Sequence, residues 1–538
     1  MRCWLKNCLL RRTPTFEMRF RRASATDRTP PRTTERMLYA ALAGAGGVLA
    51  FAPFGYWPLQ LVSLAILFYQ VLRGATVKSG ALIGWAYGFG WSVAGVHWLY
   101  VAMHTFGGMA APLAALALAL LAVLMGAYTA LAMAGAAWLR RRWLLSLPQM
   151  NLLLLPATWA WSEWARGWLF TGFPWVSAGY AHNISPLAGF APVIGVYGLS
   201  WLAALCAGAL LLLAHPSRWI ASGLLALTFG AGFALQFVTW THAEGSLLSV
   251  RLLQGNVAQD EKFNGAHLGQ ALQMYANAIT AERADLIATP ETALALFPSQ
   301  LPAGYLARLA RYAQLSNSHL LIGIPLAESA TVYSNSVLGF SPAPESKLYR
   351  YDKHHLVPFG EFIPAGFRWF VDLMAIPLGD FTRGPVVQAP FQVKDQRVLP
   401  NICYEDLFGE EIAEQLSAPN GARQRPASIL LNVSNLAWYG DSIAIAQHLQ
   451  ISQMRSLETG RPMLRATNTG ATAVIDGRGQ LISRLAPNSR GTLAATVQGM
   501  AGMTPYILFG NKLIIGISLL AVAGAAILAR IRRKNRAI

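Results

Sequence analysis

The sequence predicts a bundle of eight membrane-spanning α-helices joined to one polar α/β domain. Of its 538 residues, 54% are hydrophobic and only 13% are charged, against roughly 25% charged residues in a typical soluble globular protein. Eight apolar runs, each long enough to cross about 30 Å of hydrocarbon, flank one polar stretch, residues 241–506, on both sides. We therefore expect the polar domain to lie at a membrane.

The apolar runs also predict how the chain is placed in the membrane. They are residues 37–54, 57–72, 79–103, 110–139, 143–164, 187–214, 219–240 and 507–529. Lys and Arg residues concentrate in alternate connections and at both chain ends, so the positive-inside rule predicts cytoplasmic termini. The expected organisation begins with a basic cytoplasmic leader (residues 1–36) and a seven-span membrane domain (37–240). A domain on the outer face (241–506) and an eighth span with a basic cytoplasmic tail (507–538) follow.

The net charge of +18 is concentrated at the two ends of the chain. Residues 1–36 hold ten Lys and Arg residues, and residues 530–536 hold five more. Basic residues that flank apolar runs are explained by membrane topology, so we expect no nucleic-acid partner. The leader has no apolar stretch before Met37, which argues against a cleavable signal peptide and leaves Met37 as an alternative start.

The polar domain alternates short β-type runs with amphipathic helical patterns. The predicted strands are LLSVRLLQGNV, DLIATPE, HLLIGIP, YSNSVLGF, RVLPNICYE, ASILLNVSN, PMLRATNTG and TAVIDGRGQLI. Helical patterns lie near residues 265–284, 303–316 and 441–459. This pattern favours an α/β domain whose strands are buried on both faces.

A single cysteine of the polar domain is a candidate nucleophile. The chain has four cysteines, Cys3, Cys8, Cys206 and Cys403. Their spacing fits neither a disulfide framework nor a zinc site, and we expect no metal and no other cofactor. Cys403 alone falls in the polar domain, where a buried strand runs into a turn. A lone cysteine is commonly a buried structural residue, but Glu405 and Asp406 follow it at once, and an inert core thiol is rarely placed among ionisable groups.

Two further charged residues follow predicted strands. Glu291 comes directly after Pro290, at the mouth of a buried strand. Desolvation there would raise the pKa of Glu291 and suit it as a base. The alternative is a carboxylate in a solvated loop. Lys353 lies in the run DKHH, where two histidines could suggest a metal; adjacent side chains diverge, so we prefer a non-metal interpretation. Thiol, carboxylate and ammonium together supply a nucleophile, a base and a cation for a developing oxyanion.

The motifs around these residues are ATPETALALF, YRYDKHHLVPFGEF and PNICYEDLF. Together they resemble the carbon-nitrogen hydrolase (nitrilase) superfamily. Within it, HLVPFGEFIP, ICYEDLF, NVSNLAWYGDS followed by QHLQISQMRSLETGRP, and RATNTGATAVID, in that order, are most similar to the apolipoprotein N-acyltransferase family. The resemblance covers about residues 37–530.

The resemblance implies an αββα sandwich with a Glu-Lys-Cys triad formed by Glu291, Lys353 and Cys403. It also implicates four supporting residues, Glu361, Glu405, Tyr404 and Asn335. The sequence leaves open whether a second glutamate orients the triad lysine or shifts its pKa. Phe263 stands where the family often has Trp, and we expect its aromatic contact to survive.

The resemblance implies transfer of a fatty acyl group from a phospholipid, phosphatidylethanolamine, to the α-amino group of the N-terminal diacylglyceryl-cysteine of lipoproteins. The reaction would be ping-pong through a thioester on Cys403, with Lys353 and a backbone N–H near Tyr404 stabilising the oxyanion. We expect a monomer in a bacterial inner membrane, with the catalytic domain on the periplasmic side. The apolar stretch 367–381 is expected to dip into the bilayer as a membrane arm, with ordinary core packing as the alternative. Its candidate residues are Trp369, Phe370 and Met374.

Two other functions fit part of the pattern. A membrane-tethered amidase or nitrilase for small C–N bonds would use the same triad, but a small polar substrate gives no reason for eight spans. A non-catalytic transporter or scaffold would be indicated by charge within the spans, which hold few ionisable groups beyond Glu163, His97 and the boundary residue Lys512.

Overall fold

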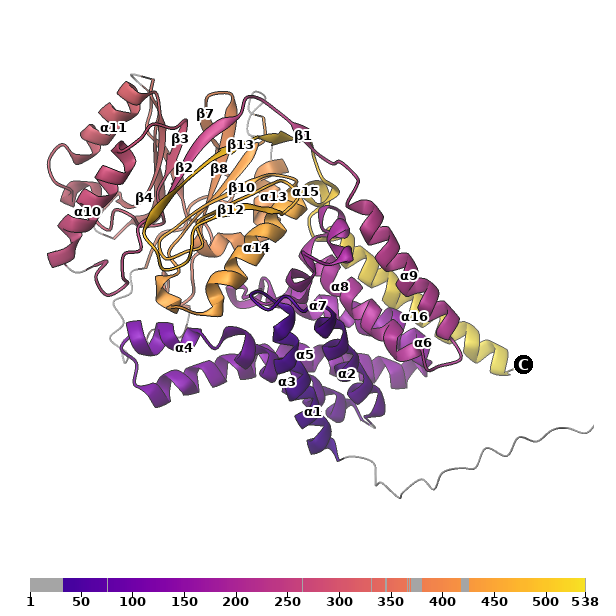
Figure 1. The fold of residues 1–538 in the computed structure, drawn as a ribbon. Helices are drawn as coiled ribbons and strands as arrows, with labels where there is room; N and C mark the ends of the chain where they lie inside the picture. The colour runs from indigo at the N-terminus through magenta and orange to yellow at the C-terminus, as the bar shows by residue number, and fades with distance from the viewer. Residues whose placement is uncertain are drawn as a thin grey trace, which may run out of the picture.

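The computed structural model describes residues 32–537, apart from 75, 264, 330, 344–345, 365, 367, 369–379 and 418–424. A helical part and an α/β sandwich make up the fold, and the sandwich lies above the helices in Figure 1. Most of the basic leader and the three candidate arm residues, Trp369, Phe370 and Met374, lie outside the described residues.

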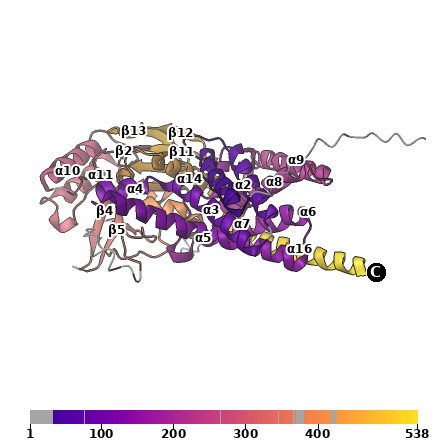
Figure 2. The ribbon, with the colours of Figure 1, turned by 90° about the horizontal axis from the view of Figure 1, so that it is seen from below.

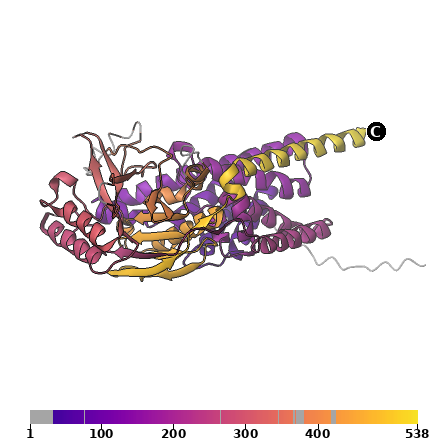
Figure 3. The same cartoon turned by 90° about the horizontal axis from the view of Figure 1, so that it is seen from above.

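The helical part contains helices at all eight predicted spans. They are α1 (Thr33–Gly47), α2 (Pro58–Arg73), α3 (Val77–Val96), α4 (Leu99–Val101), α5 (Ala111–Trp143), α6 (Leu147–Gln149), α7 (Leu155–Arg166), α8 (Ala191–Leu212), α9 (Arg218–Leu235) and α16 (Lys512–Ala537). Shorter helical turns are η1 (Val48–Ala50), η2 (Ala102–Phe106), η3 (Met150–Leu154), η4 (Leu169–Thr171), η5 (Ala178–His182) and η6 (Pro186–Phe190). Four segments of the described chain are long and apolar enough to cross a membrane, namely α5, Pro186–Leu212, α9 and Lys512–Asn535. Helices α9 and α16 extend away from the sandwich (Figures 2 and 3).

Two predicted spans are less regular than single helices. The span at 143–164 has a left-handed residue, Leu144, at its second position and contains a π-helical turn, η3. Pro148 lies in the first turn of α6, where a missing N–H breaks no hydrogen bond. Pro156 lies within the continuous helical run 147–166, directly after the π-helical turn, which accommodates its missing N–H. Helix α8 is interrupted at Gly195, whose φ of +64° suits glycine. The break frees the N–H of Val196, which donates to a sandwich residue, Glu458 (2.8 Å).

The sandwich has two six-stranded sheets, each with three parallel strands. One sheet has the order β13-β2-β3-β4-β5-β6, with β2, β3 and β4 parallel, and the other the order β12-β11-β10-β9-β8-β7, with β8, β9 and β10 parallel. The strands of the first sheet are β2 (Leu248–Gln254), β3 (Leu286–Ala288), β4 (His319–Ala327), β5 (Tyr333–Phe340), β6 (Tyr349–Asp352) and β13 (Gly491–Val497). Those of the second are β7 (Phe391–Val393), β8 (Gln396–Ile402), β9 (Ile429–Ser434), β10 (Met463–Thr467), β11 (Ala473–Ile475) and β12 (Leu481–Arg484). A small ribbon pairs β1 (His242–Ala243) with β14 (Met500–Ala501).

Helices cover both outer faces of the sandwich, which gives the expected αββα layers (Figure 1). They are α10 (Gly265–Thr280) and α11 (Tyr305–Ser316) on the first sheet, and α13 (Gly409–Ser417) and α14 (Ile443–Thr459) on the second. Alternation along β2 shows the layering: Val250 and Leu252 face the core between the sheets, whereas Leu253 packs beneath α10 and α11. Three short turns, η7 (Pro298–Gln300), η8 (Cys403–Leu407) and η9 (Ala437–Tyr439), and helix α15 (Pro505–Phe509) complete the fold.

Helix α14 joins the two parts of the molecule. One face packs on the second sheet and the other contacts α8, so 13 of its 17 residues are buried. Gln447 of α14 accepts hydrogen bonds from the indole N–H groups of Trp98 (3.1 Å) and Trp175 (2.9 Å) of the helical part. Helix α14 also contacts η8 (Cys403–Leu407), the turn that follows β8, so Cys403 lies close to the helical part.

Candidate active site

Glu291 is held by the loop that follows β3. Strand β4 comes very close to this loop, because Gly323 has no side chain: a Cβ there would lie 2.1 Å from the carbonyl oxygen of Pro290. The N–H of Gly323 donates to Thr289 Oγ1 (3.0 Å), and the N–H of Leu294 donates to the Gly323 carbonyl (3.1 Å). The loop is thereby tied to the sheet, and Glu291 is only 7% exposed.

Lys353 follows β6 and points into the same place. Its N–H donates to the carbonyl of Asn335 on β5 (2.9 Å). Its Nζ lies 2.8 Å from Glu361 Oε1 and 3.3 Å from Glu291 Oε1. The Nδ2 of Asn335 donates to both carboxylates at 2.8 Å. Four of the residues singled out from the sequence therefore form one buried, hydrogen-bonded group.

Cys403 begins the turn η8 directly after β8. Its φ of +53° is a left-handed conformation that is costly for a residue with a side chain. Its carbonyl accepts from His448 Nε2 (3.2 Å) and Asn432 Nδ2 (3.4 Å), which help to hold this conformation. The residue is 9% exposed, and the charges of Glu291 and Lys353 act on its thiol.

Burial and nearby charges shift the pKa values of Glu291 and Lys353 in opposite directions. Burial alone would raise the pKa of Glu291, but the nearby ammonium groups of Lys353 and Lys262, with the donors Asn335 and Asn435, outweigh it and lower that pKa. The expectation of a raised pKa was wrong, because desolvation was considered without the cations. Burial opposes the charge of Lys353, but Glu361 and Glu291 outweigh it and raise the Lys353 pKa.

The thiol behaves differently from the two charged groups. Burial, reinforced by the negative charge of Glu291, raises the pKa of Cys403, while Lys353 lowers it. The resting site is thus a neutral thiol beside an ionised carboxylate and an ammonium. Glu361 contacts Lys353 Nζ (2.8 Å), and its negative charge raises the Lys353 pKa.

Glu405 connects the turn at Cys403 to the segment that follows Lys353. Its carboxylate accepts from the N–H groups of Ile402 (2.6 Å) and His354 (2.6 Å) and from the Tyr351 hydroxyl (3.1 Å). Burial, only partly offset by those backbone donors, raises the pKa of Glu405 to about 7. Its oxygens thus hold the backbone on both sides of the site.

The two histidines next to Lys353 point to different carbonyls. His354 Nδ1 donates to Gly384 (2.7 Å), and His355 Nε2 donates to Thr171 (2.8 Å) in the helical part. Within the described ranges, no group of three or more His, Cys, Asp or Glu side chains could hold a metal ion.

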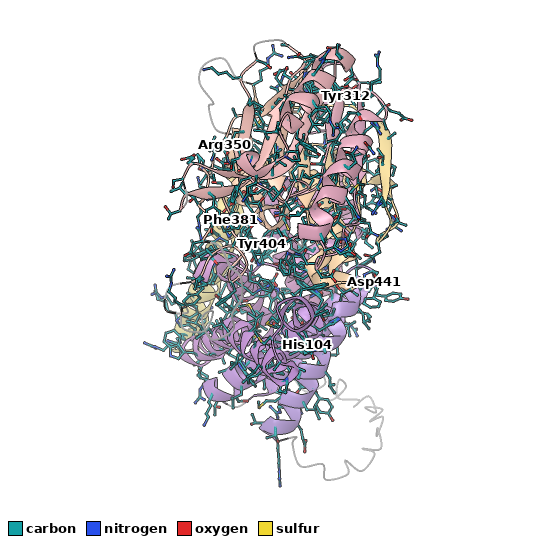
Figure 4. All side chains as sticks on the ribbon, turned by 90° about the vertical axis from the view of Figure 1, so that its left-hand side faces the viewer. His104, Tyr312, Arg350, Phe381, Tyr404 and Asp441 are labelled. Atoms are coloured by element: carbon teal, nitrogen blue, oxygen red, sulfur yellow. The ribbon has the colours of Figure 1, made fainter. Side chains whose placement is uncertain are left out.

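Tyr404 lies at the boundary between the two parts of the molecule (Figure 4). Its hydroxyl donates to the Gly172 carbonyl (2.8 Å), and the Tyr180 hydroxyl donates to the Leu407 carbonyl (3.3 Å). The turn that carries Cys403 is therefore in contact with the connection between α7 and α8.

Reasoning from the sequence missed two residues at this site. Lys262, 5% exposed, donates from Nζ to the Glu291 carbonyl (3.0 Å), and burial lowers its pKa to about 8 despite the charge of Glu291. The N–H of Asn435 donates to Glu291 Oε2 (2.8 Å). Lys262 stands in the charged run DEK, which resembles a solvated loop, whereas Asn435 lies in the motif NVSNLAWYGDS. Phe263, the residue after Lys262, is 57% exposed. We call Glu291, Lys353, Glu361 and Lys262 the front cluster.

Comparisons with known proteins agree with this architecture. The model of the apolipoprotein N-acyltransferase N-terminal domain matches residues 43–209, and the carbon-nitrogen hydrolase model matches residues 250–506. The apolipoprotein N-acyltransferase of Ralstonia nicotianae is 48% identical over 503 residues, covering 93% of this chain and 94% of the relative. That of Nitrosomonas europaea is 45% identical over 515 residues, covering 93% and 99%.

Among solved structures, a carbon-nitrogen hydrolase from Helicobacter pylori G27 aligns with 46% of this chain and 88% of its own, at 15% identity and a TM-score of 0.32. That likeness is too low to add to what the sequence relatives show. Helical and carbon-nitrogen hydrolase regions occur here in the same chain, and the named relatives match nearly its whole length. This chain therefore belongs to the apolipoprotein N-acyltransferase family.

Proposed function

We propose that this protein transfers a fatty acyl chain from a phospholipid, with phosphatidylethanolamine as the expected donor, to the α-amino group of the N-terminal diacylglyceryl-cysteine of lipoproteins. One observation carries the proposal: a buried thiol lies beside a Glu-Lys ion pair, on a turn that contacts the connection between helices α7 and α8. The names of the relatives, N-acyltransferases of apolipoproteins, supply the reaction class.

In the first half-reaction, Glu291 takes the proton of Cys403 while the sulfur attacks the ester carbonyl carbon of the phospholipid. The oxyanion is stabilised by Lys353 and by the N–H of Tyr404; one such donor is typically worth about 3 kcal/mol. The bond from the carbonyl carbon to the glycerol oxygen then breaks. Lysophospholipid leaves with the proton from Glu291, and a thioester remains on Cys403.

In the second half-reaction, the α-amino group of the lipoprotein attacks the thioester carbonyl. Glu291 takes a proton from the attacking amine, the C–S bond breaks, and the thiol of Cys403 is restored as an amide forms. The two half-reactions share one covalent intermediate, so the kinetics are ping-pong.

The proposed setting is a bacterial inner membrane crossed by eight helices, with residues 241–506 on the periplasmic side and both termini in the cytoplasm. Four long apolar helices support insertion, and the Lys and Arg residues at alternate connections support the orientation. The proposed active unit is a single copy, because all three members of the proposed triad come from it.

The reaction is tested by following one labelled acyl chain. Purified protein is incubated with phospholipid labelled in its acyl chain and then, after removal of the lipid, with a diacylated lipopeptide. Label should appear first on the Cys403 peptide by mass spectrometry and then on the lipopeptide amine. Cys403→Ser is the control that should take up no label. Release of free fatty acid or hydrolysis of a small amide, without transfer to the lipopeptide, would contradict the proposal and favour a hydrolase.

A further inference from the structure

His448 of α14 lies between the backbone of the proposed nucleophile and a buried guanidinium. Its Nε2 is 3.2 Å from the Cys403 carbonyl oxygen, and its Nδ1 is 2.8 Å from Arg465 Nη2. Arg465 also contacts Asp406 (3.3 Å) and Ser452, and all four side chains are fully buried. We call His448, Arg465, Asp406 and Ser452 the rear cluster.

The guanidinium fixes the tautomer of His448. A guanidinium group has hydrogen-bond donors only, and although burial lowers the pKa of Arg465 to about 10, it stays a cation at neutral pH. Nδ1 must therefore accept, which leaves the proton of a neutral imidazole on Nε2. Burial and the charge of Arg465 both lower the pKa of His448, which favours the neutral ring. The Nε2–H consequently donates to the Cys403 carbonyl.

That carbonyl belongs to the same peptide unit as the N–H of Tyr404. A trans peptide unit is planar, and its C=O and N–H point in opposite directions. A carbonyl held toward His448 and Asn432 therefore turns the Tyr404 N–H the other way. Tyr404 is the second residue of η8, so its N–H has no acceptor within that turn and is available to a bound oxyanion.

We propose that His448 is a positioning residue, which fixes the Cys403–Tyr404 peptide so that the Tyr404 N–H faces the acyl carbonyl under attack. This inference rests on the proposed acyl transfer and deepens it. His448 touches neither the substrate nor the thiol in this account; it acts only through the peptide that it holds.

The helical part holds His448 in place. The ring of Trp175, from the connection between α7 and α8, stacks on the imidazole with centroids 5.6 Å apart and planes inclined by 25°. The preceding residue, Gln447, accepts from the indoles of Trp98 and Trp175. The oxyanion donor of the sandwich is therefore set partly by aromatic side chains of the helical part.

Two substitutions that differ by one methylene group test the assignment in the full-length protein. In His448→Gln, the amide can reach the Cys403 carbonyl with a donor and still offer an oxygen to Arg465. In His448→Asn, the oxygen can accept from Arg465, but the shorter side chain cannot reach Cys403. His319→Asn, at the far end of β4, is the control for the loss of a buried histidine in the same domain.

Two rates are measured for each variant: single-turnover acylation of Cys403 by labelled phospholipid, and alkylation of Cys403 by iodoacetamide, which forms no oxyanion. We expect His448→Asn to acylate about 10- to 100-fold more slowly and to be alkylated at the rate of the unsubstituted protein. His448→Gln and His319→Asn should keep both rates. Equal acylation by the asparagine and glutamine variants would overturn the proposal, and so would a parallel loss of both rates in His448→Asn.

An activated fatty-acyl ester serves as a second donor. Acylation by that ester but not by phospholipid would contradict the proposed donor, while the comparison of the His448 variants would still decide the present inference. If His448→Asn does not fold, the His448→Gln variant decides the inference. A folded His448→Gln protein that is no longer acylated by the ester would overturn the inference, and a folded one that is still acylated by the ester would support the inference.

Discussion

The front and rear clusters both border the turn at Cys403, but their charges are arranged for different ends. The front cluster sets two carboxylates against two ammonium groups, all carried by loops and strand ends of the sandwich. The rear cluster pairs one carboxylate, Asp406, with one guanidinium, Arg465, both fully buried. Front-cluster charges act on the pKa values of the proposed reacting groups, whereas the rear cluster holds the backbone at Cys403. Buried charges beside one turn can therefore either tune pKa values or fix the backbone, and substitutions can separate the two roles.

The largest expected effect is on reactivity in the front cluster. Glu291→Gln keeps the shape of the side chain but removes the proposed base, so acylation of Cys403 should slow by about 10²- to 10⁴-fold. The thermal unfolding midpoint should also fall, because Glu361 is then the one carboxylate of the front cluster that faces the two buried ammonium groups. Single-turnover acylation and thermal unfolding, measured on one preparation, check both statements. Near-normal acylation would remove Glu291 from the mechanism and leave the front cluster as a structural feature.

Substitutions in the rear cluster should mainly lower the free energy of unfolding. Arg465→Met leaves the carboxylate of Asp406 buried without its cation, which typically costs about 3–5 kcal/mol. Chemical denaturation monitored by fluorescence measures this loss. Ser452→Ala is the milder companion, since it removes a neutral hydroxyl from the same carboxylate. An Arg465→Met protein as stable as the unsubstituted chain would show that the two clusters do not differ in the way described.

Lys262 makes the front cluster sensitive to pH. Burial lowers its pKa in the folded protein to about 8, against about 10.4 in an unfolded chain. Between these pH values the unfolded state binds more protons than the folded state. The free-energy cost of burying the Lys262 charge is therefore full below pH 8, and it declines as the pH rises toward 10. The unsubstituted protein should therefore gain stability relative to Lys262→Met over that window. Denaturation of both proteins at pH 7, 8, 9 and 10 tests this, and a constant difference would show that Lys262 does not titrate there.

The smallest expected effect concerns the contact between the sandwich and the helical part. Tyr404→Phe removes the hydrogen bond to the Gly172 carbonyl and should cost about 1 kcal/mol. Tyr349→Phe loses a hydrogen bond of the same length, to the exposed Ala389 carbonyl (2.8 Å), away from Cys403. Tyr349→Phe should lose less stability, because water can solvate the freed carbonyl, and only Tyr404→Phe should also slow acylation. Equal acylation rates would show that the contact with the helical part does not influence the site.

Much of the sandwich was predictable because its central strands and helices have strong local patterns. The eight predicted strands coincide with strands of the structure, and the helical patterns coincide with α10, α11 and α14. TAVIDGRGQLI was predicted as one strand, but it forms β11 and β12. The side chain of Asp476 accepts the N–H groups of Arg478 and Gln480 and so turns the chain between them. Strands β6, β7 and β13 were not predicted; β6 and β7 are very short, and β13 is largely half-exposed.

The site was predictable as far as reactive residue types stand at strand ends. Glu291, Lys353 and Cys403 were marked by such positions and by family motifs, and Glu361 and Asn335 by the motifs alone. Lys262 was missed because nothing in the run DEK separates a buried ammonium from a solvated one. The sign of the Glu291 pKa shift was missed for the same reason, since it depends on cations brought from other loops.

The sequence by itself determined where apolar helices and buried strands form, and which reactive groups end those strands, because such properties follow from local periodicity and residue chemistry. Only the tertiary structure decided that Lys262 faces Glu291, that His448 holds the Cys403 carbonyl and that Trp175 stacks on His448. These contacts join residues up to 273 positions apart, and a hydrogen bond or a Coulomb interaction depends on distance in space, which the order of residues along the chain does not record.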